Sequence, residues 1–177
     1  MKKIIVLGLV LATAIVAQGA QRIVMEAEAT TTIEAPFAVV AEGAAGAVAG
    51  ASGGYLEIAA GKGKPPEEKD KIAKVTYAFE VEAEDAFVLW LRVYWEGECN
   101  NSFNARFDEG PQFLIGETPT FKKWHWVKFP VARNAAPVRL AKGSHTLTLF
   151  HRQDGVRVDQ ILLTTDRRYV PVEIEKK

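Results

Sequence analysis

The feature that most constrains the fold of this chain is a repeated alternation of apolar and polar residues with a period of two. It is clearest in residues 72–81, where Val75, Tyr77, Phe79 and Val81 are apolar and mostly polar residues intervene. Successive side chains of a β-strand point to opposite faces, so this alternation predicts a strand with one buried face. Helical periodicity is hard to find after residue 20. We therefore expect an all-β protein.

Residues 86–95 are apolar on both faces of a predicted strand. One face carries Phe87, Leu89, Leu91, Val93 and Trp95, and the other carries Val88, Trp90, Arg92 and Tyr94. A strand that is apolar on both sides is covered on both sides, which is typical of the middle of a sheet. We predict that this segment is a central strand.

Seven further segments have the composition of short strands. They are residues 23–28, 55–59, 102–107, 112–115, 126–131, 145–151 and 156–164. Turn-forming residues separate them, as in residues 43–54 and 108–111, at spacings typical of sandwiches and barrels. Residues 61–71 are rich in Lys, Glu and Pro and are predicted to form a solvated loop. Two packed antiparallel sheets are the expected outcome.

The first twenty residues have the features of a secretory signal peptide. Lys2 and Lys3 precede an apolar stretch, and small residues follow at Ala17, Gly19 and Ala20. The apolar stretch is shorter than the roughly 20 residues that span a bilayer, so no membrane span is expected after cleavage. We predict a signal peptide over residues 1–20, one domain over residues 21–177, and a secreted protein that is periplasmic, cell-surface or extracellular.

Composition argues against two classes of partner. The 22 basic residues equal the 22 acidic ones, which leaves no net positive charge to attract nucleic acid or an anionic membrane. Cys99 is the only cysteine of the chain, so an internal disulfide is excluded. Cys99 is either a buried small residue or an exposed thiol that can pair between chains.

Catalytic machinery is not evident in the sequence. His125, His145 and His151 lie on different predicted strands without metal-ligand spacing, and no serine or cysteine has the context of a nucleophile. A glycosidase with two carboxylates that are distant in the sequence is left open. We predict that the protein is not an enzyme.

Three carboxylates suggest a cation site. Glu26 and Glu28 are two residues apart on a predicted strand and would point to the same face. Asp159 lies in an apolar strand, where an unpaired charge would be costly. Such hard oxygen ligands suit calcium. The alternative is that the glutamates form a polar strand face and Asp159 pairs with an arginine such as Arg157 or Arg152.

Aromatic residues near polar side chains suggest a sugar site. Phe121, Trp124 and Trp126 follow a turn, and Tyr94 and Trp95 end the central strand; Asn100, Asn101 and Arg157 are the polar candidates. Sugar rings stack their C–H faces on aromatic planes, while hydroxyl groups bind amides, carboxylates and guanidinium groups. The alternative is that most of these aromatic residues fill the core.

The order and spacing of several motifs resemble carbohydrate-binding modules of families 6 and 35, which have a galactose-binding-like β-jelly-roll fold. The resemblance covers residues 22–171. The motifs are Glu26-Ala-Glu28, Ala51-Ser-Gly-Gly-Tyr55, Leu89-Trp-Leu-Arg92, Asn101-Ser-Phe103, Trp124-His-Trp-Val127, Leu140-Ala-Lys-Gly143, His145-Thr-Leu147, Arg152-Gln-Asp-Gly155 and Val158-Asp-Gln-Ile161.

The resemblance implies a β-sandwich jelly roll with a structural calcium on Glu26, Glu28 and Asp159. It also implies a sugar site at one edge, with Phe121 as the stacking residue. Arg157 stands where the pattern has an asparagine. A guanidinium group binds carboxylate or sulfate with two hydrogen bonds, so Arg157 suggests an acidic sugar.

The sequence therefore predicts non-catalytic binding of a polysaccharide or other glycan, with a structural calcium. The predicted sugar-binding residues are Phe121, Trp124, Trp95, Arg157 and Asn100. Further partners would be a separate carbohydrate-active enzyme or copies of the chain itself. The alternative function is a structural or adhesive jelly-roll subunit of a cell-surface or extracellular assembly.

Overall fold

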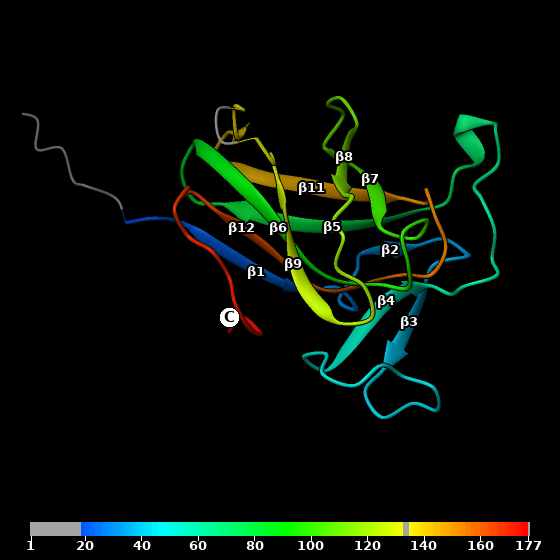
Figure 1. The fold of residues 1–177 in the computed structure, drawn as a ribbon. Coiled ribbons are helices and arrows are strands. Elements are labelled where there is room, and N and C mark those ends of the chain that lie inside the picture. Colours follow the sequence, from blue (N-terminus) through cyan, green and yellow to red (C-terminus); the bar gives the residue numbers. More distant parts are fainter. Residues whose placement is uncertain (1–18, 133–134, 177) are drawn as a thin grey trace, which may run out of the picture.

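A computed structural model describes residues 19–132 and 135–176 as a sandwich of two antiparallel β-sheets (Figure 1). The all-β class and the two sheets predicted from the sequence are confirmed. Most of the predicted signal peptide lies outside the described residues, and both the signal peptide and the single-domain assignment stay predictions. Within the described part of the chain, no helix is long and apolar enough to cross a membrane.

The larger sheet has seven strands and is built around two of them. β6 (Asp85–Trp95) pairs with β12 (Val156–Thr164) over most of their lengths. The free side of β6 pairs with β10 (Val138–Leu140) and β9 (Trp124–Phe129). The free side of β12 pairs with β4 (Gly54–Ile58) and then with β1 (Arg22–Glu26), and β3 (Ala38–Ala41) adds to β4.

The smaller sheet has five strands in the order β2-β5-β11-β7-β8. Their bounds are Thr32–Ile33 for β2, Lys74–Val81 for β5, Gly143–Phe150 for β11, Ser102–Phe107 for β7 and Phe113–Gly116 for β8. The predicted loop over residues 61–71 is largely exposed and contains one short 3-10 helix, Lys69–Lys71.

The structure adds three short strands to those predicted and shortens another. β2, β3 and β10 have two to four residues each, too few for an alternating pattern to be read. β1 ends at Glu26 instead of residue 28, because the N–H group of Ala29 donates to the carbonyl oxygen of Glu26 and closes a turn. Glu28 therefore lies in this turn, and strand alternation does not place it beside Glu26.

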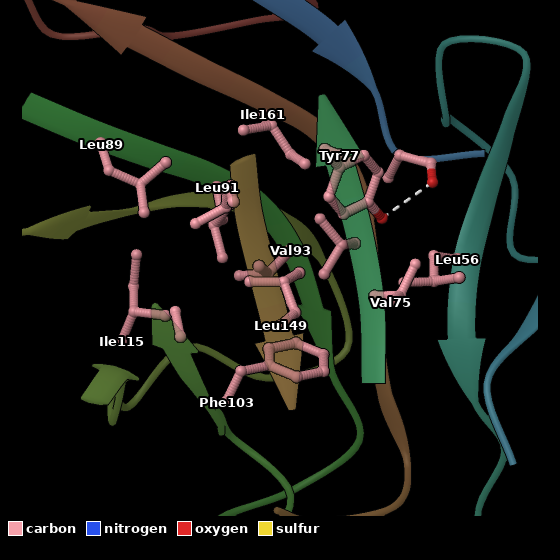
Figure 2. Packing of buried hydrophobic residues seen from close by; sticks show 14 of the residues in the cluster. Leu56, Val75, Tyr77, Leu89, Leu91, Val93, Phe103, Ile115, Leu149 and Ile161 are labelled. Atoms are coloured by element: carbon pink, nitrogen blue, oxygen red, sulfur yellow. Dashed lines mark hydrogen bonds between the residues drawn. The ribbon is translucent and has the colours of Figure 1, made fainter. Parts of the chain in front are cut away.

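The inward faces of both sheets form one apolar core (Figure 2). Leu89, Leu91 and Val93 of β6 face Phe103 and Leu149 of the smaller sheet, and all five are at most 1% exposed. This is the face of residues 86–95 that the sequence pattern predicted to be buried. The central position of β6 is confirmed, because it has a partner on each side.

The other face of β6 is covered by the segment that follows β12. Val88, Trp90 and Leu162 form a second buried cluster, against which Trp126 and Tyr169 pack. The Trp126 indole N–H donates to the carbonyl oxygen of Glu173 at 3.0 Å. The segment is also fixed by the 9% exposed Glu175, which pairs with Arg22 at the start of β1 and accepts a hydrogen bond from Tyr169.

Tyr77 connects the two sheets through its hydroxyl group. This group donates to the carbonyl oxygen of Ala27, just after β1, at 2.9 Å (Figure 2). Tyr77 is 1% exposed, and this burial, with the nearby Glu28 carboxylate, raises the pKa of the hydroxyl. The hydroxyl is therefore a neutral donor at ordinary pH.

We expect Tyr77→Phe to lower the free energy of unfolding by about 1–2 kcal/mol, because it leaves a buried carbonyl oxygen without its donor. Urea denaturation followed by circular dichroism measures the change. Tyr94→Phe, on the half-exposed outer face of β6, is the control and should change stability by less than about 0.5 kcal/mol. Equal midpoints for Tyr77→Phe and the wild type would contradict this role.

Candidate functional site

Asp159 is a fully buried carboxylate at an irregular point of β12. The register between β12 and β6 shifts between Val158 and Gln160, where the other neighbour of β12 changes from β4 to β1. The interruption places the Asp159 side chain against the loop that precedes β4. There Oδ1 accepts hydrogen bonds from the N–H and hydroxyl groups of Ser52, both at 2.8 Å.

Arg92 supplies the positive charge that Asp159 requires. Its Nη1 donates to Asp159 Oδ2 and to the carbonyl oxygen of Gly50. The arginine side chain is only 12% exposed, so this is a largely buried ion pair. The sequence interpretation correctly gave Asp159 an arginine partner but named the wrong one. Arg157 and Arg152, the two candidates, bind other carboxylates.

The predicted calcium ligands lie around the loop before β4. Ser52 joins Glu26 to Asp159, since its hydroxyl is within hydrogen-bond distance of both carboxylates, and Gln160 Nε2 donates to both oxygens of Glu26 at 3.1 Å. Glu28 lies beside Gly53 and Gly54. Among the described residues, no group of three Asp, Glu, His or Cys side chains is arranged to hold a metal ion. The donors have the chemistry that calcium prefers, but a cation would share Asp159 with Arg92.

Two aromatic rings and two arginines form a row on the outer face of the larger sheet. Arg92 lies over the Trp124 ring at 5.4 Å, Trp124 meets Tyr94 edge-on at 5.5 Å, and Arg157 lies over Tyr94 at 5.1 Å. The Trp124 indole N–H donates to the carbonyl oxygen of Ala49. Both rings are half-buried, and each already has a cation against it.

The charge of Arg157 is neutralised by two carboxylates. Its Nε donates to Glu57 at 3.1 Å and its Nη1 to Glu96 at 2.8 Å. Burial disfavours the charged form, but the hydrogen bond and attraction to Glu96, with that of Glu57, outweigh it and raise the pKa of Arg157. With 14% of its side chain exposed, Arg157 has little capacity left for a sugar carboxylate or sulfate.

The remaining predicted sugar-binding residues have different environments. Trp95 is fully buried, with its indole N–H on Thr118, so we correct its assignment from sugar contact to core. Phe121 is half-buried and packs against the core. Asn100 is half-buried and lines a cleft. The structure thus brings Trp124 and Arg157 together through Tyr94, while Trp95 is separated from them by full burial and Phe121 packs against the core.

The cleft lies where the loops after β4, β6 and β11 meet, and its volume is about 820 Å³. Most of the residues that line it have amide or charged side chains. They include Lys64, Asn100, Asn101, Glu117, Arg152 and Asp154. Arg152 lies 3.6 Å from Glu117 and donates to Ser102, so its charge is also paired. The cleft borders the aromatic row at Gly155. This glycine packs against Asn100 of the cleft and against Glu96, which binds Arg157 of the row.

Asp154 holds the walls of this cleft together. Its Oδ2 accepts hydrogen bonds from the N–H groups of Gly61 and Gly63 at 2.8 and 2.9 Å, and its Oδ1 accepts one from the Asn100 amide at 3.0 Å. His151, just before it, lies with Nε2 3.1 Å from the carbonyl oxygen of Gly63. One carboxylate therefore links three loops that are far apart in the sequence.

The histidines have local structural partners. His125 contacts Thr118, and His145 contacts Asp108 at 2.7 Å. Burial lowers the pKa of His125 and that of His151. For His145, burial acts in the same direction, but the hydrogen bond to Asp108 outweighs it and raises the pKa. The three histidines thus have three different partners and do not form a shared site.

The fold is similar to that of solved carbohydrate-binding modules. A family 35 module from Clostridium thermocellum aligns with a TM-score of 0.58 at 12% identity, covering 81% of this chain and 97% of the module. The carboxyl-terminal family 6 module of the laminarinase LamC from Zobellia galactanivorans aligns with a TM-score of 0.52 at 14% identity, covering 81% and 99%. This chain has the fold of these modules.

A larger protein contains the same fold. In the β-(1,4)-mannanase GH26-CBM35 of Podospora anserina, the match has a TM-score of 0.61 at 18% identity and covers 87% of this chain. The chain spans about a third of that enzyme, 30% of its length. At such identities the similarity establishes the fold. By sequence, the chain matches no family model and no curated protein.

Sequence reasoning missed the roles of Arg92, Ser52 and Asp154. Arg92 left a signal, because it is the one charged residue in the otherwise apolar residues 86–95 and a buried arginine requires a carboxylate. Ser52 and Asp154 left no signal in the sequence. Ser52 binds a carboxylate 26 residues away, and Asp154 binds a backbone N–H group 93 residues away.

We expect Arg92→Gln to lower the free energy of unfolding by about 3 kcal/mol or more, because it leaves Asp159 as a buried charge without its cation. Chemical denaturation measures this loss. Arg139→Gln, which removes an exposed pair with Glu84, is the matched control and should cost at most about 1 kcal/mol. Adding Asp159→Asn to Arg92→Gln should recover part of the loss. Equal effects of the two arginine substitutions would contradict a buried pair.

Proposed function

We propose that the protein is a secreted, non-catalytic module that binds a polysaccharide or other glycan in the cleft beside Gly155. The observation that carries the proposal is a cleft of about 820 Å³, rich in amide and charged groups, at one end of a fold shared with carbohydrate-binding modules. Amides and charged side chains are the groups that bind sugar hydroxyls. Binding sites of this size are usually preformed hollows.

Two features favour the cleft over the aromatic row as the main contact surface. The rings of Trp124 and Tyr94 each have an arginine against them, so less of their area is left for a sugar. The cleft instead has Asn101 in its lining, and the backbone N–H and carbonyl groups of this residue are bound by Gln153 and Glu117, which leaves its amide side chain as the group to bind a sugar. Trp124 would then contact only the part of a glycan that extends past Gly155.

We expect Asn101→Ala to weaken glycan binding about fivefold to tenfold, the effect of losing roughly 1–1.4 kcal/mol of hydrogen bonding. The ligand comes from a glycan array probed with the purified protein, and calorimetry then measures the affinity. Asn104→Ala, on β7 and outside the cleft lining, is the matched control and should bind as the wild type does. A folded protein that binds no glycan on the array would overturn the proposal.

The structural calcium also belongs to the proposal. It is supported by the sequence resemblance and by Glu26 and Asp159, which lie on either side of Ser52 and offer hard oxygen ligands. Arg92 already neutralises Asp159, so an added ion would compete with the guanidinium group for that carboxylate. Any stabilisation by calcium would therefore depend on Glu26 and on the loop before β4.

We expect saturating calcium to raise the melting temperature by roughly 5 °C over the value in chelator, as binding at a hundredfold excess over Kd contributes about 2.7 kcal/mol. Differential scanning fluorimetry measures the shift. Glu26→Gln should abolish it, while Glu82→Gln, on a different loop, should leave it intact. Identical melting curves with calcium and with chelator would mean that Arg92 alone balances Asp159.

A structural subunit is the second candidate function, favoured by one observation. Val170, Val172 and Ile174 alternate along the segment after β12 and are 63%, 85% and 43% exposed. Such a row of exposed apolar side chains is typical of contact surfaces. Light scattering separates the two functions, because a subunit of an assembly would self-associate at micromolar concentration, whereas a glycan-binding module would stay dispersed without its ligand.

A further inference from the structure

A second hollow lies at the far end of β12 from the cleft, and its polar lining is cationic. Its volume is about 490 Å³, and Lys128, Arg167 and Arg168 are the charged residues that line it. β12 begins next to the cleft and ends just before Arg167, so the two hollows are separated by the length of a nine-residue strand, about 30 Å. The lining of the second hollow includes Pro130, Ala132, Ala135 and Pro137 from the part of the chain after β9, and the two arginines from the turn after β12.

The cations gather here although the chain as a whole has no net charge. The described residues that line the hollow include no aspartate or glutamate, and the other side chains are apolar ones such as Val88, Pro130 and Pro137. The like charges of Lys128 and Arg168 repel each other, and apolar walls strengthen that repulsion by lowering the local dielectric constant. An anion in the hollow would relieve it.

Local contacts hold two of the cations in place. Lys128 lies on β9, with its ammonium group 5.4 Å from the centre of the Trp90 ring. Arg168 belongs to a turn in which its N–H group donates to Asp166 Oδ1 at 2.9 Å, while the Asp166 N–H donates to Thr164 at 3.1 Å. The charges are therefore presented by a sheet and by a fixed turn, which reduces the entropy lost on binding.

We propose that this hollow is a binding site for the carboxylate or sulfate groups of an acidic polysaccharide. Guanidinium groups bind such oxyanions with paired hydrogen bonds, and the ammonium group of Lys128 adds a point charge. The choice of a polysaccharide rests on the proposed function, because the same chain would then bind glycan at both ends of β12. This hollow, and not Arg157, supplies the cationic groups for an acidic glycan.

Dextran, dextran sulfate and carboxymethyl dextran test the proposal, because they share a backbone and differ in charge. In calorimetry at low salt, the protein should bind the two charged polymers at least tenfold more tightly than dextran. Lys128→Gln and Arg168→Gln should each lower that ratio severalfold, with unchanged melting temperatures. Lys142→Gln, an exposed lysine outside the hollow, is the matched control and should keep the ratio.

The other outcomes separate this site from the cleft. If all three charge variants lowered the affinity ratio equally, the binding would be general electrostatic attraction and the proposal would be overturned. An unchanged ratio in Lys128→Gln and Arg168→Gln would also overturn it. Binding of anionic lipid vesicles, lost in the same two variants, without binding of dextran sulfate would assign the hollow to a membrane surface and also overturn it. The array could yield no glycan for the cleft while Asn101→Ala still binds the charged polymers more tightly than dextran. That result would retain this site and reject the proposed function of the cleft.

Discussion

The pairing of β6 with β12 is the interaction on which the rest of the structure depends. Every other strand of the larger sheet adds to one of these two, directly or through β4. Because β6 is apolar on both faces, its inner face forms the core and its outer face requires the cover that the segment after β12 provides. The pairing also contains the irregularity at Asp159, so the buried ion pair with Arg92 is part of the same central element.

Much of this fold could be predicted from the alternation of side chains. β5 and β6 are long enough for the pattern to be read, and the same pattern assigns Trp95 to the core face of β6 with Leu89 and Leu91. The aromatic ring of Trp95 made it a sugar-binding candidate, but its position in the strand was the stronger evidence and placed it in the core. The strands that were missed are too short to show a period, and their existence depends on a neighbouring strand.

The candidate site was harder to predict, because its contacts join residues that are distant in the sequence. The need of Asp159 for a partner followed from its apolar surroundings, but the choice among arginines depended on the strand register, which brings Arg92 to it. The cleft depends on backbone N–H groups of Gly61 and Gly63, which donate to Asp154 across 93 and 91 residues of sequence. A sequence pattern carries no record of such contacts.

The contact between Arg22 and Glu175 brings the two ends of the described chain together. The cleft, by contrast, is formed by loops at the start of β12, whereas Arg22 pairs with Thr164 at the end of that strand. The Glu175 backbone is bound to Gln160 in the middle of β12, so only the start of β1 lies at the end of the sandwich opposite the cleft. If a linker before β1 tethered the protein to another domain or to a support, the cleft would lie on the side away from the attachment, with its loops unobstructed.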